Sequence, residues 1–400
     1  MLPIADIAAA PASLALSGLP EGLLPWLAAD LARAGALHGR RTVVIASDEA
    51  KARAIVDTAS FFAPELETVW LPAWDCLPYD RAGPAQRVLA ERLLALATLT
   101  RPPEGAQLLV TTVSAALQRL LPPEVVAENS LTLRPGQRIE REALVATLGR
   151  LGYLRAETVA DAGDYAVRGG LVDLLPPAAD EALFGYRLDF FGDELDSIRI
   201  IDPATQLTTG KADHLLLSPV SELLLDEQHI RDFRRAYLER FGAVATADPT
   251  YQAASEGRRA PGLEHFLPLF EPRLVTLSDW LADDDLLLLD SGAPMAAGQR
   301  FEAIADYHQN RMAALQAPAA RGRTQGAPYR PLPPNLLYLG EPEWQAMLAR
   351  AHQTSPLPGE GGLRIDARTA PDFTPARAQA AAGGPPIHQL LAERLNAARA

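Results

Sequence analysis

The chain of 400 residues contains a single cysteine, Cys76. One thiol cannot supply an internal disulfide, a Cys-x-x-Cys redox pair or a cysteine zinc site. Long apolar runs are also missing, since no run approaches the roughly 20 residues that a membrane span needs. The N-terminal stretch lacks the basic region of a secretory signal. These absences predict a cytoplasmic protein that does not bind a membrane.

Lysine is scarce, with Lys51 and Lys211 as the only two among 37 basic residues. The 50 acidic residues give a formal net charge of -13. Sequence-independent binding to nucleic-acid phosphates needs an excess of cations, so this charge argues against it as the main activity. Hydrophobic residues make up 48% of the chain, enough to bury real cores, and the length predicts two to four domains.

The motifs of common catalytic sites are absent from the sequence. A GxxxxGK[ST] phosphate loop is missing, because Lys211 follows Gly210 but Thr205 stands where the first glycine belongs. The glycine turn Ser17–Gly22 has no lysine, and its Glu21 would repel phosphate. No Gly-x-Ser-x-Gly or His-Glu-x-x-His motif occurs, and the seven histidines are scattered. We therefore expect no catalytic residue, metal or cofactor. The alternative is a helicase-type enzyme with a non-standard nucleotide site at Ser17–Gly22.

Alternating strand and helix patterns fill the start of the chain and return in its second half. Continuous apolar runs, typical of strands in a buried parallel sheet, occur at 41–47, 68–71, 107–113 and 285–290. Helical patterns cover 23–34, 49–62, 86–99, 114–121, 227–241, 274–281 and 300–313. Between them, from about residue 126, short β-like runs predominate around a helix at 141–151. The pattern predicts an α/β fold, a split doubly wound body with an inserted small mixed α/β domain.

We place four units along the chain. Residues 1–125 and 214–350 form the two parts of the body, residues 126–213 form the insert, and residues 351–400 are a linker and the start of a following domain, with a helix at 387–400. A Pro-, Gly- and Arg-rich stretch at 317–334 is expected to be a loop. Its segment Arg321–Arg330 is a weak candidate for contact with DNA phosphates.

The hairpin of the insert carries the strongest binding signal. Two β runs flank the turn Gly192-Asp193. Alternation directs Tyr186, Leu188 and Phe190 to a core and directs Arg187, Asp189 and Phe191 to solvent. Arg168, beside two glycines, is a third candidate. Exposed arginine and aromatic residues are typical of protein-binding hot spots. The alternative is that Phe191 packs beneath a loop and Arg187 pairs with Asp189 or Glu194.

Four segments resemble motifs of one protein family, and they occur in the family's order. These segments are WDCLPYD at 74–80, DYAVRGGLVDL at 164–174, YRLDFFGDELDSIR at 186–199 and GLEHFLPLF at 262–270. They resemble the N-terminal UvrB homology module (domains 1a, 2 and 1b) of the transcription-repair coupling factor, Mfd. The likeness spans about residues 70–270.

The resemblance implies a UvrB-like body that has lost its nucleotide site and an inserted domain 2 that binds the nucleotide-excision-repair protein UvrA. The family's contact residues carry over to Arg168, Arg187 and Phe191. Full-length members are ATP-dependent DNA translocases that use ATP and Mg and bind RNA polymerase and double-stranded DNA through regions whose motifs do not occur here. We therefore expect an inert UvrA-recruiting adaptor, either a fragment or a stand-alone remnant. Arg187→Ala or Phe191→Ala should weaken UvrA binding with little change in the thermal midpoint.

Overall fold

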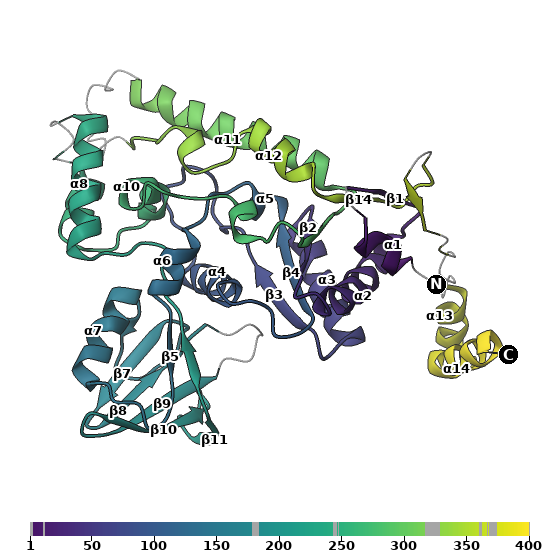
Figure 1. Cartoon of the computed structure of the whole chain (residues 1–400), viewed down its shortest axis with the longest axis horizontal. Helices are drawn as coiled ribbons and strands as arrows, with labels where there is room; N and C mark the ends of the chain where they lie inside the picture. The colour runs from purple at the N-terminus through teal and green to yellow at the C-terminus, as the bar shows by residue number, and fades with distance from the viewer. Residues whose placement is uncertain are drawn as a thin grey trace.

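A computed structural model describes residues 3–10, 13–177, 184–242, 246, 248–316, 329–359, 362–365, 367 and 374–399. Residues 321–328 of the candidate DNA-contacting stretch lie outside the described residues. No described helix is long and apolar enough to cross a membrane. The elements form two bodies, a large one built on a parallel sheet and a smaller one below it (Figure 1).

The large body is built on a seven-stranded sheet in which every pair of neighbouring strands is parallel. The strand order is β15-β1-β14-β13-β2-β4-β3. Apolar runs form the centre of the sheet, because helices cover both faces and every residue of the central strands is buried. The strands are β1 (Ala15–Ser17), β2 (Thr42–Ala46), β3 (Glu67–Leu71), β4 (Gln107–Thr112), β13 (Leu286–Leu289), β14 (His352–Ser355) and β15 (Leu363–Arg364).

Two hydrophobic cores lie on opposite faces of this sheet. One face is covered by α1 (Ile4–Ala8), α2 (Leu24–Ala36) and α3 (Glu49–Phe62). The other is covered by α4 (Gln86–Leu99), α5 (Val113–Ala116), α6 (Pro123–Glu128), α8 (Glu227–Phe241), α9 (Pro249–Ser255), α10 (Leu267–Phe270), α11 (Ala293–Gln316) and α12 (Glu341–Leu348). The long α11 runs across the top of the body (Figure 1).

The smaller body is a six-stranded sheet with the order β11-β10-β9-β8-β7-β6, backed on one face by α7 (Arg141–Leu151). A two-stranded pair, β5 (Leu131–Leu133) with β12 (Leu215–Leu217), leads into and out of it. We call residues 131–217 the module. Its strands are β6 (Leu154–Arg155), β7 (Asp164–Arg168), β8 (Leu171–Leu174), β9 (Gly185–Phe191), β10 (Glu194–Ile201) and β11 (Thr208–Ala212). The predicted α/β body with an inserted mixed sheet is confirmed.

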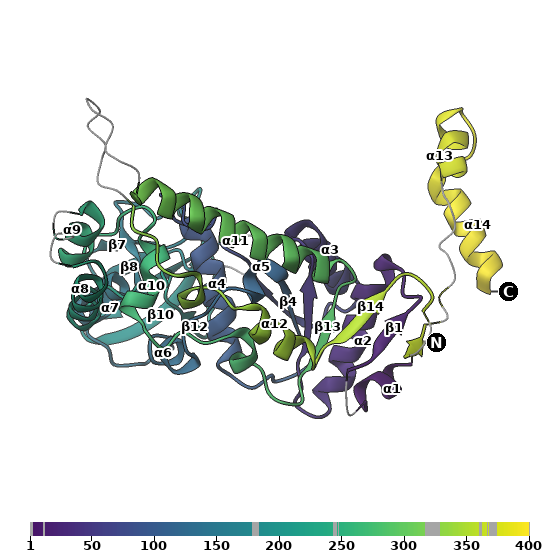
Figure 2. The same cartoon turned by 90° about the horizontal axis from the view of Figure 1, so that it is seen from above.

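The end of the parallel sheet differs from the prediction. Residues after 350 were expected to be a linker, but β14 lies between β13 and β1, and β15 lies beyond β1 (Figure 2). The four residues of β14 carry no apolar pattern. The ring of His352 accepts a hydrogen bond from the Leu14 amide at 3.0 Å, and the Thr354 hydroxyl donates to the Leu289 carbonyl at 2.9 Å. Polar side chains that are bonded in this way can occupy buried strand positions.

Two smaller predictions were also wrong. The helix placed at 114–121 is the short α5, and its N-cap is Thr112 rather than Ser114. The helix placed at 274–281 is only a 3₁₀ turn at Leu277–Trp280, because Val275 bridges Leu120 instead. The final helix is α14 (Ile387–Arg399), which packs on α13 (Thr374–Ala381). This helical pair lies apart from both bodies in two views (Figures 1 and 2).

Candidate functional site

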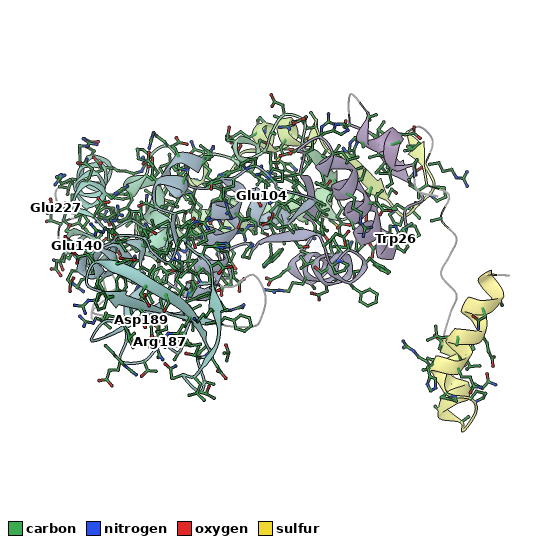
Figure 3. The ribbon with its side chains drawn as sticks, turned by 60° about the horizontal axis from the view of Figure 1, so that its bottom comes forward. Trp26, Glu104, Glu140, Arg187, Asp189 and Glu227 are labelled. Atoms are coloured by element: carbon green, nitrogen blue, oxygen red, sulfur yellow. The ribbon has the colours of Figure 1, made fainter. Side chains whose placement is uncertain are left out.

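The face of the module sheet opposite α7 is lined by charged side chains. Register places Asp173, Arg187, Arg199 and Lys211 in one row across β8, β9, β10 and β11. Residues that pair across strands project on the same face of a sheet, so these four side chains share one surface. We call this surface the open face. Figure 3 labels Arg187 and Asp189 along this sheet.

Arg187 is held by a two-pronged ion pair within the open face. Its Nε lies 2.7 Å from Asp173 Oδ1, and its Nη2 lies 2.8 Å from Asp173 Oδ2. The hydrogen bond with Asp173 raises the pKa of Arg187 above its ordinary value. The Asp173 side chain is only 3% exposed and that of Arg187 17% exposed. The pair is therefore part of the sheet, and Arg187 presents only part of its guanidinium to solvent.

Further cations surround this pair. Arg199 lies directly opposite Arg187 in the register and pairs with Asp189, with its Nη2 2.7 Å from Oδ2. Lys211 lies opposite Arg199 and is exposed. Like charges that face each other across strands repel, and the two aspartates interleaved among them offset that repulsion. The row that runs through Asp173, Arg187, Arg199 and Lys211 therefore carries three cations and one carboxylate on a strongly acidic chain.

Phe191 and Arg168 lie nearer the end of the open face than Arg187. Phe191 comes two residues after Asp189 on β9 and is 85% exposed. Arg168 pairs with Leu171, which pairs with Asp189, so Arg168 lies in the same row as Asp189. Arg168 is also exposed. Its Nη2 donates to the Glu157 carbonyl at 2.7 Å and to the Thr158 hydroxyl at 2.6 Å. These bonds hold the guanidinium in one orientation at the surface.

The structure therefore places all three predicted residues on one face but in different environments. Phe191 does not pack beneath a loop, and Arg187 pairs with neither Asp189 nor Glu194. Its partner is Asp173 on the neighbouring strand. The sequence reasoning missed Arg199 and Lys211, which the register adds to the same row. Alternation along the strand after the hairpin turn could have indicated Arg199, whereas Lys211 lies on β11 and joins the row only through strand pairing.

A second possible site lies at the carboxyl ends of the parallel strands. In doubly wound sheets ligands bind where the chain leaves neighbouring strands in opposite directions, here between β2 and β13. Lys51 Nζ lies in this crevice, 2.9 Å from Asp290 Oδ1 and 3.0 Å from Glu21 Oε1. Burial acts to lower the pKa of Lys51, but hydrogen bonds to these carboxylates outweigh it and raise the pKa.

The charges of this crevice disfavour phosphate. The Asp48 side chain accepts a hydrogen bond from the Lys51 amide and caps the N-terminus of α3, the position where a phosphate would otherwise bind. The carboxylates of Glu21 and Asp290 both lie within hydrogen-bond distance of the Lys51 ammonium group, and the nearby Asp48 carboxylate adds a third negative charge. Among the described residues, no group of three or more His, Cys, Asp or Glu side chains is arranged to hold a metal ion.

Two of the family-like motifs meet where the two bodies join. The indole of Trp74 donates to Glu222 Oε2 at 3.0 Å, and Arg92 Nε lies 2.8 Å from Glu222 Oε1. Arg92 is fully buried and also donates to the Pro72 carbonyl. His265, from the later motif, packs edge-on against Trp74 with ring centroids 5.5 Å apart. These motifs therefore build a joint between the two bodies.

Two neighbouring groups in the joint have displaced pKa values. Burial raises the pKa of Glu264 to about 7. Burial also lowers the pKa of His265 to about 4. Gly262 begins this segment with φ +77°, and a Cβ there would lie 2.7 Å from the Arg81 carbonyl oxygen, so the position needs glycine. The joint is thus closely packed around side chains whose uncharged forms are favoured.

Comparison with known proteins agrees with this architecture. The UvrB interaction domain family matches residues 131–223, which include the whole module. Transcription-repair-coupling factors from Haemophilus influenzae and Escherichia coli are 34% and 32% identical over 68% and 76% of the chain. The factor from Rickettsia bellii is 31% identical over 68% of the chain. The chain is similar to the N-terminal module of the transcription-repair-coupling factors. It spans about a quarter of the length of these relatives, since the matches cover 23–25% of them.

Proposed function

We propose that this coupling-factor module recruits UvrA in transcription-coupled nucleotide excision repair, and that the open face is its contact surface. The relatives' name points to coupling of transcription and repair, and the match to the UvrB interaction domain supports an interaction role for the module. RNA polymerase, double-stranded DNA, ATP and Mg belong to this proposal only for full-length members of the family.

The observation that carries the proposal is the exposure of Phe191 beside ordered arginines. Phe191 is 85% exposed, so a partner that covers its ring makes the free energy of binding more favourable. Arg168 is fixed in orientation by its hydrogen bonds to Glu157 and Thr158, so little side-chain entropy is lost when it binds. The cations of the open face suit an acidic patch on the partner.

Phe191→Ala is the sharpest test. We expect the affinity for UvrA, measured by titration calorimetry, to fall about 30-fold, because an aromatic hot spot contributes about 2 kcal/mol. Phe61→Ala is the matched control, since Phe61 is 79% exposed and lies on α3 of the large body. Phe61 packs edge-on against Phe62, which contacts Trp26, and Trp26 lies on the opposite side of the large body from Arg187 (Figure 3).

The structure changes the expectation for Arg187→Ala. Its removal leaves the buried Asp173 carboxylate without a partner, so the thermal midpoint should fall together with UvrA binding. Arg168→Ala is the cleaner arginine variant, because Arg168 is exposed and bonds only to a carbonyl and a hydroxyl. Unchanged UvrA affinity in both Phe191→Ala and Arg168→Ala would refute the open face as the contact surface.

A further inference from the structure

The outer edge of β3 is an open sheet edge on the large body. β3 ends the strand order, and no strand of the described part of the chain pairs with its outer side. The Glu67 amide donates to the Ala106 carbonyl beside β4, so the ladder to β4 uses Glu67, Val69 and Leu71. In a parallel ladder the alternate residues, Thr68 and Trp70, direct their amide and carbonyl groups outward. Such an edge is a template for another strand.

A cavity of about 140 Å³ opens beside this edge. Its walls are Thr68, Val69 and Trp70 on the strand and Glu91, Leu94 and Ala95 on α4. Glu67 and Thr98 line both this cavity and a second one of about 390 Å³, which continues toward the module. The two cavities therefore adjoin at the start of the edge strand.

The first cavity contains polar atoms that lack partners. Glu91 Oε1 lies 2.6 Å from Arg87 Nη1, but Glu91 Oε2 is buried with no hydrogen bond. The indole nitrogen of Trp70 is also buried with no hydrogen bond. Burial raises the pKa of Glu91, since its carboxylate is removed from water without full compensation. A cationic side chain is the strongest partner for such a carboxylate.

We propose that the edge of β3 binds an extended segment of a partner protein, which adds to the sheet as an eighth strand and places an arginine or lysine beside Glu91. The backbone of the segment pairs with Thr68 and Trp70, and the stem of its basic side chain packs on Leu94 and Ala95. This surface belongs to the large body and is separate from the open face, so the proposal does not depend on UvrA.

The test uses the whole chain and a synthetic peptide, acetyl-Thr-Val-Thr-Arg-Val-Thr-Val-amide. We expect this peptide to slow hydrogen exchange at the amides of Thr68 and Trp70. A peptide with glutamate in place of its arginine should bind at least tenfold more weakly. Glu91→Gln should weaken binding of the arginine peptide about tenfold, because a charge-assisted bond becomes a neutral one. Asp57→Asn, which removes an exposed charge from α3, is the control and should leave binding unchanged.

Three results would overturn the proposal. One is unchanged exchange at Thr68 and Trp70 under saturating arginine peptide. Another is equal binding of the arginine and glutamate peptides. The third is protection of these amides that grows with protein concentration when no peptide is present, because a second copy of the chain would then occupy the edge. Thr68→Pro, tolerated at an outward-facing edge position, should abolish the protection of Trp70 while the far-ultraviolet spectrum stays unchanged.

Discussion

The large body and the module each contain a buried aspartate paired with a cation, but the surroundings of the two cations differ. Asp290 and Asp173 are 2% and 3% exposed, and their partners Lys51 and Arg187 are 23% and 17% exposed. Lys51 has Glu21 and Asp48 around it, whereas Arg187 faces Arg199 across the strand pair. The ion pair in the crevice therefore has further carboxylates beside it, whereas the ion pair on the open face has further cations beside it. Neighbouring charge, more than the pair itself, decides which cation can attract a partner.

Among the predicted changes in the free energy of unfolding, the largest should come from removal of the buried aspartates Asp173 and Asp290. Asp173→Ala leaves Arg187 beside Arg199, and we expect a loss of about 3 kcal/mol in the free energy of unfolding. Asp290→Ala leaves Lys51 with Glu21 as a remaining partner, so the expected loss is smaller, about 2 kcal/mol. Urea denaturation of both variants measures the difference.

A double variant provides the control for this comparison. Asp173→Ala with Arg187→Leu should recover part of the loss, because no unpaired charge is then buried. If Asp290→Ala proves as costly as Asp173→Ala, the surrounding charge does not distinguish the two pairs.

A second effect should appear in the joint between the two regions. The pKa of His265 is lowered to about 4, so the unfolded state binds a proton first and stability falls as pH drops from 6.5 toward 4. The pKa of Glu264 is raised to about 7, so the folded state holds a proton and stability falls as pH rises from 4.5 toward 7. Between pH 4.5 and 6.5 the two contributions oppose each other.

Single variants should reveal the opposed slopes. Glu264→Gln should make the protein about 2 kcal/mol less stable at pH 4.5 than at pH 6.5, and His265→Asn should reverse the sign. Denaturant titrations at both pH values measure these differences, with the parent chain expected to be nearly flat. A parallel pH response of the two variants would contradict the opposed linkage.

The smallest effect is expected at the crevice. Glu21→Ala should change the free energy of unfolding by less than about 0.5 kcal/mol, because the Glu21 side chain is 61% exposed. Lys51 stays paired with Asp290 in this variant, so we also expect no saturable ATP binding, with or without DNA. Saturable ATP binding in a calorimeter would revive the nucleotide-dependent enzyme as an alternative.

Periodicity predicted most of the fold. The helices at 49–62, 86–99, 141–151 and 227–241 have the predicted bounds, since one amphipathic face fixes each of them. The strands β1 and β14 escaped prediction, because they are short and β14 buries polar side chains that bond across the sheet. In the site, alternation along β9 separated Arg187 from Leu188. Alternation could not predict that Asp173 contacts Arg187, because this contact depends on the pairing of β8 with β9.

The position of β14 has a consequence for how the polypeptide is made. Among the described strands, β1 has only β14 and β15 as neighbours, and the Leu14 amide bonds to a side chain 338 residues later. A nascent chain emerges from the ribosome N-terminus first, so Ala15–Ser17 leaves the exit tunnel long before its neighbours exist. A contact between residues so far apart in the sequence forms slowly, because closing the long intervening loop costs conformational entropy. β1, which is synthesised before the other strands of this sheet, is thus among the last of them to find its partners.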